Sequence, residues 1–147
     1  MIQLKLIALD AADVPILSAH LQDAVVRVSD IAYSSRDRRF AAHCNRYNWQ
    51  DTSAVNNGSG GERRRAALRI ERVTAVQSQG FDPAAPQTVL SILAITFKPD
   101  AAHPPAGIVT IVCAGGATLR FTVECPEMVL EDLGPAWQAS HQPVHPD

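Results

Sequence analysis

The stretch IVTIVCAGGATLRFTVEC, residues 108–125, decides the fold because it predicts an antiparallel β-hairpin. Gly115 and Gly116 lie between two strand-like runs, and paired glycines supply the positive φ angles that tight hairpin turns require. Apolar and polar residues alternate from Leu119 to Glu124, which is the pattern of a strand with one buried face. We therefore expect antiparallel sheet on both sides of this turn.

Runs of the same kind recur along the chain. A change in the phase of the apolar residues near Glu71 and Arg72 indicates a β-bulge. TVLSILAITFK, residues 88–98, is apolar at nearly every position and predicts a central strand covered on both faces. Besides the two arms of the hairpin, the expected strands cover residues 4–9, 25–33, 39–49, 63–80 and 88–98.

Two helices are expected beside these strands. In DAADVPILSAHLQDA, Asp13 can cap a helix over residues 14–24, because Pro15 then falls in the first turn, where its missing N–H is tolerated. A second, short helix over residues 127–133 is expected because a proline precedes this segment and a glycine follows it.

The order of these elements defines an α+β protein. We expect a mostly antiparallel rolled sheet or small barrel of about seven strands, with an N-terminal helix after strand 1 and a short C-terminal helix. This layout is pleckstrin-homology-like by analogy, and an open α+β sheet is the alternative. A chain of 147 residues suits one core, so residues 1–137 are expected to form a single globular domain. Residues 138–147 are polar and proline-rich and are expected to be a disordered tail.

Positive charge is concentrated in one part of a chain whose net charge is −2. Residues 27–72 hold ten arginines and five acidic residues, whereas the rest of the chain holds three basic and ten acidic residues. If the strands within 25–49 and 63–79 are neighbours, two groups of arginines lie at one edge of the sheet. Arginine forks bind carboxylates, so we expect this edge to contact another protein with an acidic surface. The alternative is a solvated rim whose arginines pair with the surplus acids. The candidate contact residues are Arg36, Arg38, Arg39, Arg46, Trp49, Arg63, Arg64 and Arg65.

The sequence holds no established catalytic or metal-binding motif. The five histidines form no HExxH pattern; His141 and His145 are spaced four apart, but in a proline-rich segment rather than on a predicted helix, and the three cysteines lie far apart. The GxSxG nucleophile motif and the GxxxxGK phosphate loop do not occur. We therefore assign no catalytic, metal-ligating or cofactor-binding residue, and expect a non-catalytic interaction or regulatory module without a cofactor rather than an enzyme.

SAHLQDAVVRV, residues 18–28, places His20 and Asp23 one helical turn apart. Asp23 falls in the last turn of the expected helix, where its charge opposes the helix dipole and calls for a nearby cation. We interpret His20, Asp23 and Arg27 as a structural clasp between helix and sheet. The alternative is a small-ligand-binding protein or enzyme that uses His20 and Asp23. Nucleic-acid binding through residues 27–72 is a weaker alternative, because few aromatic residues are available to stack bases.

Six segments carry a family resemblance: HLQDAVVRVSDIAY, RRFAAHCNRYNW, RRRAALRIERV, LSILAITF, AGGATLRFTVEC and LEDLGPAW. In this order they resemble the uncharacterised alphaproteobacterial family known as domain of unknown function 2948, over about residues 4–137. The resemblance implies a small cytoplasmic bacterial protein with no assigned activity, cofactor or catalytic residue.

Nothing in the sequence predicts contact with a membrane. The N-terminal segment has no signal-peptide core, and no run of 18 apolar residues occurs, so we expect a cytoplasmic protein. An exposed sheet edge would permit a homodimer, but no feature of the sequence requires one.

Overall fold

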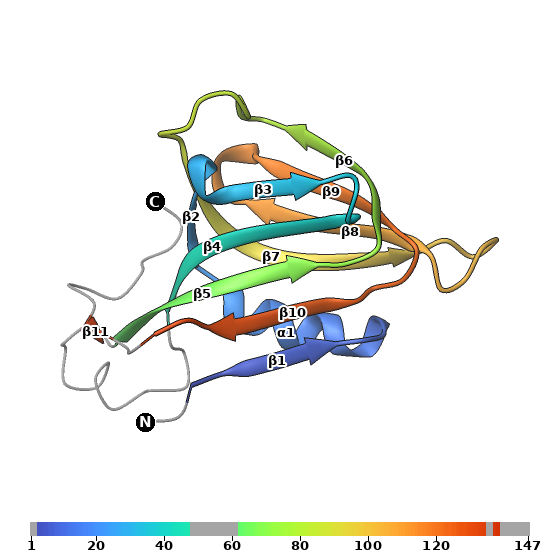
Figure 1. Ribbon diagram of the computed structural model, residues 1–147, viewed down its shortest axis with the longest axis horizontal. Helices are drawn as coiled ribbons and strands as arrows, with labels where there is room; N and C mark the ends of the chain where they lie inside the picture. The colour runs from blue at the N-terminus through green and yellow to red at the C-terminus, as the bar shows by residue number, and fades with distance from the viewer. Residues whose placement is uncertain (1–2, 48–61, 135–136, 139–147) are drawn as a thin grey trace.

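The structure is a computed structural model that describes residues 3–47, 62–134 and 137–138. In this part of the chain, one antiparallel sheet of eleven strands curls around the core, and a single α-helix, α1, lies beside it (Figure 1). The expected α+β class is confirmed, whereas the sheet has more strands than the seven predicted.

The strands follow one another closely in sequence, with 3₁₀ turns between some of them. They are β1 (Lys5–Ala8), β2 (Val25–Arg27), β3 (Ile31–Ser34), β4 (Arg39–Tyr47), β5 (Glu62–Ile70), β6 (Val73–Gln79), β7 (Val89–Pro99), β8 (Gly107–Cys113), β9 (Thr118–Val123), β10 (Met128–Asp132) and β11 (Trp137–Gln138). Their order in the sheet is β1-β10-β5-β4-β2-β7-β8-β9-β6, with β3 against β4 and β11 against β5.

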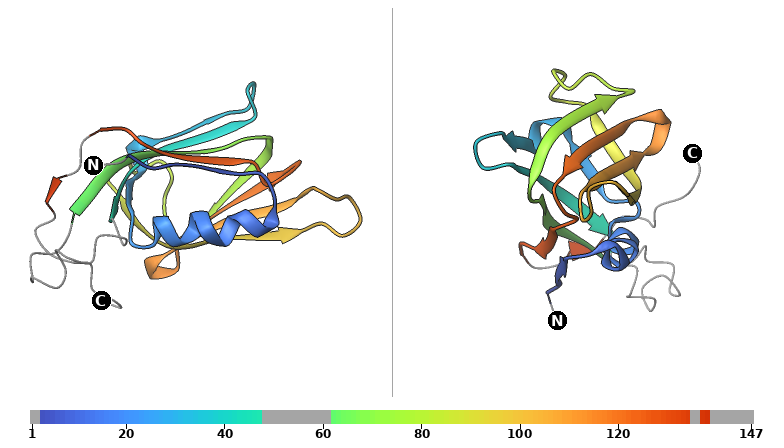
Figure 2. Two further views of the ribbon diagram at one scale, coloured as in Figure 1. Left: turned by 90° about the horizontal axis from the view of Figure 1, so that it is seen from below. Right: turned by 90° about the vertical axis from the view of Figure 1, so that its right-hand side faces the viewer.

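The curl of the sheet comes from two segments that pair with each other twice. β5 runs on into β6, β9 runs on into β10, and the ribbon they form pairs β5 with β10 and β6 with β9. Between β5 and β6, Arg72 adopts a φ of 59°, and the register shifts between Val73 and Ala75. The bulge expected near Glu71 and Arg72 is therefore confirmed as a break that bends one strand into two (Figure 2).

Alternation along the strands builds the core. On β4, Phe40, Ala42 and Cys44 are buried while the residues between them lie on the outer face. The Phe40 ring lies 4.5 Å from that of Phe121 on β9, measured between centroids. The hairpin formed by β8 and β9 turns at Gly115 as expected.

The first helix is shorter than expected. A 3₁₀ turn (Ala11–Asp13) leads into α1 (Val14–Leu21), which packs on β7 and ends three residues before the predicted limit. Asp23 adopts a φ of 67°, and its N–H donates to the carbonyl of Ile92 on β7 at 2.8 Å. This contact draws the chain into the sheet and ends the helix.

The strand predicted over residues 25–33 is wrong, because a 3₁₀ turn (Val28–Asp30) divides it into β2 and β3. The N–H groups of Val28 and Ser29 donate to the carbonyls of Thr88 and Pro86, at 2.9 and 3.1 Å. These bonds hold the chain beside the start of β7 and away from β4.

The C-terminal helix predicted over residues 127–133 is also wrong. This segment is the strand β10, which lies between β1 and β5. Its residues pair with Lys5–Ala8 on one side and with Ala66–Ile70 on the other, which defines a strand, and all of them but Glu131 are buried. The pleckstrin-homology-like analogy needs this helix and loses its main support. Of the predicted tail, residues 138–147, Gln138 belongs to β11 and residues 139–147 lie outside the described residues.

Gly80, directly after β6, tests whether the turn there needs a residue without a side chain. It adopts a φ of +82°, and a Cβ there would overlap the carbonyl oxygen of Gly116. We expect Gly80→Ala to lower the free energy of unfolding by about 1–3 kcal/mol. Gly134→Ala is the control, because a Cβ at Gly134 meets nothing within 4 Å. Equal urea midpoints for the two variants would contradict this account.

Candidate functional site

The two groups of arginines that the sequence singled out lie at opposite ends of the sheet. β4 and β5 are antiparallel, so Tyr47 pairs with Arg63 at one end, while Arg39 begins β4 at the other. The expectation that both groups share one edge is therefore wrong. Arg36 is exposed in the β3–β4 turn, and Trp49 lies outside the described residues.

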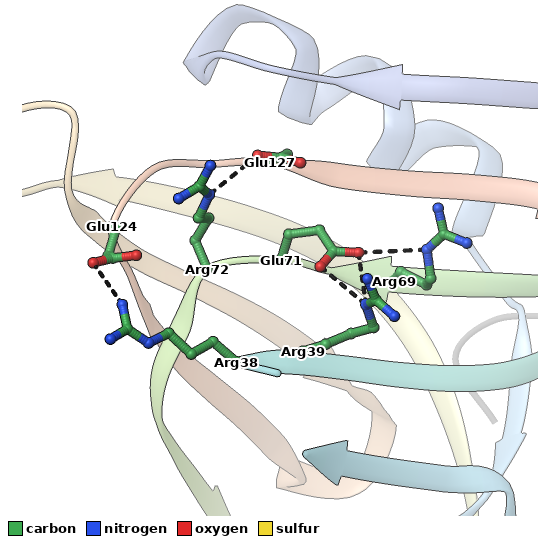
Figure 3. Close-up of polar contacts among 7 residues, drawn as sticks. All are labelled: Arg38, Arg39, Arg69, Glu71, Arg72, Glu124 and Glu127. Carbon is green, nitrogen blue, oxygen red and sulfur yellow. Dashed lines mark hydrogen bonds and ion pairs between the residues drawn. The ribbon is translucent and has the colours of Figure 1, made fainter. Parts of the chain in front are cut away.

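The end of the sheet at the β3–β4 turn is called the hairpin end below. The arginines there pair with glutamates (Figure 3). The Nε of Arg39 donates to both carboxylate oxygens of Glu71, at 2.9 and 3.0 Å. The other pairs here are Arg69–Glu71 at 3.5 Å, Arg38–Glu124 at 3.1 Å and Arg72–Glu127 at 3.7 Å. Exposed pairs of this kind contribute little to stability, and they neutralise much of the positive charge at this end.

At the other end, Arg46 and Arg64 point into the core toward Asp132. Arg46 donates to the two oxygens of Asp132 at 2.8 and 2.9 Å, and the Nε of Arg64 lies 3.8 Å from the nearer oxygen. The Leu4 N–H donates to the same carboxylate at 2.8 Å. Both arginines are buried, so they hold the sheet together and cannot contact a partner on this surface.

The pKa of Asp132 lies below its ordinary value. Burial opposes ionisation, but the bonds from Arg46 and the Leu4 N–H, with the charges of Arg46 and Arg64, outweigh it. Asp132 therefore joins four strands, β1, β4, β5 and β10, as a buried carboxylate.

Asp132→Asn tests this buried cluster. Removing the negative charge leaves two arginines buried beside a neutral amide, so we expect a loss of about 3–5 kcal/mol in the free energy of unfolding at neutral pH. Asp30→Asn, at an exposed position, should change it by less than about 0.5 kcal/mol. The measurement is urea denaturation followed by circular dichroism, and a loss below about 1 kcal/mol for Asp132→Asn would contradict the assignment.

The three residues of the predicted clasp, His20, Asp23 and Arg27, each interact with a different neighbour. Arg63 donates to the carbonyl oxygen of Asp23 at 3.4 Å and lies over the Tyr47 ring, 5.8 Å from its centroid. Burial lowers the pKa of Arg63, and the charge of Asp23 opposes this shift. Arg27 donates to Gln87 at 3.3 Å. The end of the helix is thus held by Arg63 rather than by Arg27.

His20 lies half-buried between α1 and the Arg46–Asp132 pair. Burial lowers the pKa of His20 below 6.5, the charge of Arg46 lowers it further, and Asp132 partly opposes the shift. The unfolded chain therefore binds a proton at pH values where the folded protein does not. The contribution of His20 to stability is complete above pH 6.5 and is lost as the pH falls from there through the folded pKa.

We expect His20→Gln to lose less stability than the wild type when the pH falls from about 7.5 to about 5.5. The measurement is the free energy of unfolding in urea at the two pH values. His43→Gln, at an exposed position on β4, is the control and should keep the wild-type dependence. An unchanged pH dependence in His20→Gln would refute the role given to this residue.

A polar notch of about 300 Å³ opens on the outer face of the sheet, where β2 and β3 part from β4. The register on this side of β4 passes from Val25↔Asn45 to Ile31↔Ala42. The 3₁₀ turn between β2 and β3 therefore lies opposite only two residues of β4, and the sheet splits there. The polar residues that line the notch are Arg27, Ser29, Asp30, His43, Asn45 and Arg65.

The notch gathers charged side chains that have few partners of their own. In the described part of the chain, Arg65, His43 and Asp30 form no side-chain hydrogen bond or ion pair, and Arg27 bonds only to Gln87. All four are exposed. Ligand pockets are usually mostly apolar with a few convergent polar groups; the notch has the concave form and the convergent polar groups, but its lining is mainly polar.

A second concavity, about 510 Å³, lies between α1 and β7. Its walls are mainly apolar, with Val14 on the helix and Leu93 and Phe97 on the strand, and no titratable side chain lines it. The hydroxyl of Ser18 accepts a bond from the Ile95 N–H at 2.8 Å and joins the two walls. Of these two concavities, the notch is the one lined by charged side chains.

Covalent and metal chemistry find little support among the described residues. Burial raises the pKa of Cys44 to about 12 and that of Cys113 to about 11, so both remain thiols at neutral pH. No group of three or more His, Cys, Asp or Glu side chains that could hold a metal ion occurs in the described ranges. No helix there is long and apolar enough to cross a membrane.

Sequence reasoning missed most of the notch. Arg65 was a candidate contact residue, and Arg27 was assigned to the clasp, but Asp30, His43 and Asn45 were not considered as site residues. Strand alternation alone could have placed His43 and Asn45 on the outer face with Arg65.

The fold is that of a small α+β protein with one curled antiparallel sheet and a polar notch on its outer face. The chain belongs to the family described as "Protein of unknown function (DUF2948)", whose model matches residues 4–145. No curated protein and no solved structure matches it. The resemblance to domain of unknown function 2948 is thus confirmed.

Proposed function

We propose that this protein is a non-catalytic interaction module that binds an acidic segment of a protein partner in the notch. The observation that carries the proposal is the state of Arg65, which is exposed, lines a concave site and has no acidic partner among the described residues. A guanidinium in this position can form two parallel hydrogen bonds with a carboxylate.

The surroundings of the other arginines support this choice. Arg46 and Arg64 are committed to Asp132, and Arg38 and Arg39 to glutamates. Of the seven candidate contact residues that the structure describes, Arg65 is the one that lines the notch, and Arg27 joins it from β2. His43 and Asn45 add further hydrogen-bonding groups beside them.

The alternatives receive less support. An enzyme or small-ligand site would use His20 and Asp23 together, but the two have different neighbours. Neither lines the notch or the concavity between α1 and β7. Nucleic-acid binding needs a basic track with aromatic stacking, whereas the arginines at the hairpin end are paired with glutamates.

A peptide titration tests the proposal. Acetylated tetra-glutamate amide should shift the amide NMR signals of notch residues in a saturable way, while the tetra-glutamine peptide should not. Arg65→Ala should weaken binding by about tenfold, because a charge-assisted bidentate contact is lost. Arg120→Ala, an exposed arginine on β9, is the matched control and should bind as the wild type does.

Two results would overturn the proposal. One is equal binding of the acidic peptide by Arg65→Ala and wild type. The other is tighter binding of an oligouridylate than of the acidic peptide, with the steep salt dependence that phosphate contacts give, which would indicate nucleic-acid binding instead.

A further inference from the structure

Asp30 gives the notch a negative charge that a purely acidic ligand would not satisfy. Its carboxylate is exposed and lines the same site as Arg27 and Arg65. In the described part of the chain it forms no ion pair with either arginine. The notch therefore holds opposite charges that do not neutralise each other directly.

The size of the notch makes this charge important for a bound ligand. A volume of 300 Å³ corresponds to a sphere about 8 Å across, which is close to the distance over which physiological salt screens charges. A carboxylate held by the arginines therefore lies within range of Asp30 and is repelled by it. A positive group placed beside that carboxylate would convert the repulsion into attraction.

We propose that the notch recognises a mixed-charge segment, in which an acidic side chain bound by Arg65 and Arg27 is followed by a basic side chain bound by Asp30. The proposal rests on the function proposed above, because it adds a second contact to the same site. The hydroxyl of Ser29, which lines the notch beside Asp30, can accept a further hydrogen bond from an ammonium group.

The two charged residues, Arg65 and Asp30, lie on different elements of the fold. Arg65 lies on β5, whose register with β4 is continuous from Phe40↔Ile70 to Tyr47↔Arg63. Asp30 ends the 3₁₀ turn that bonds to the segment before β7. A ligand that bridges the notch thus contacts both walls of the split in the sheet, with its acidic group at Arg65 and its basic group at Asp30.

The test uses two peptides that differ in one side chain. They are acetyl-Gly-Glu-Lys-Gly-amide and acetyl-Gly-Glu-Gln-Gly-amide, titrated into the full-length protein and followed by NMR. Wild type should bind the lysine peptide about two- to fivefold more tightly than the glutamine peptide, since one exposed ion pair has an effect of this order. In Asp30→Asn the preference should disappear, while the glutamine peptide should bind at least as tightly as before.

Controls separate this proposal from the one on which it rests. Arg65→Ala should weaken both peptides, whereas Asp37→Asn, at an exposed acid in the β3–β4 turn, should keep the wild-type preference. Equal affinities of wild type for the two peptides, with binding still dependent on Arg65, would overturn the mixed-charge proposal alone. Binding of both peptides that is unaffected by Arg65→Ala would overturn both proposals.

Discussion

The buried carboxylate of Asp132 is the interaction on which the arrangement of the sheet depends. It accepts bonds from Arg46 on β4 and from the Leu4 N–H beside β1, and it lies close to Arg64 on β5. Such a group tolerates burial only because its partners are positioned around it. Four strands, β1, β4, β5 and β10, must therefore meet in one register before the carboxylate is satisfied.

This buried cluster and the notch lie on opposite faces of the same strands. β4 and β5 direct Arg46 and Arg64 inward, so the residues next to them along each strand, Asn45 and Arg65, must point outward. The geometry of the notch therefore depends on the core. The register that places the inner arginines beside Asp132 also fixes Arg65 beside Asn45. A slip of one residue would exchange the two faces and destroy both sites.

Local patterns in the sequence predicted those elements whose partners are adjacent along the chain. The hairpin around Gly115 and the alternating strand from Arg39 were recognisable because the buried face follows a period of two. The break after Arg27 was not recognisable, since it depends on hydrogen bonds to residues about 60 positions later. β10 was assigned to a helix because it is short and its flanking proline and glycine also occur at helix ends. The notch is formed by that unpredicted break, so its outline could not be derived from the sequence.

The charge of residues 27–72 shows why a count of arginines overstates the positive surface of a β-protein. Three consecutive residues have three environments: Arg63 stacks on Tyr47, Arg64 is buried near Asp132, and Arg65 is exposed in the notch. In a strand, neighbouring side chains point to opposite faces, so a run of basic residues is divided between core and surface. Paired glutamates then remove much of the charge at the hairpin end. The exposed charges that line the notch are of both signs, Arg27, Arg65 and Asp30, and the proposed mixed-charge recognition would select a ligand by the arrangement of its charges rather than by their sum.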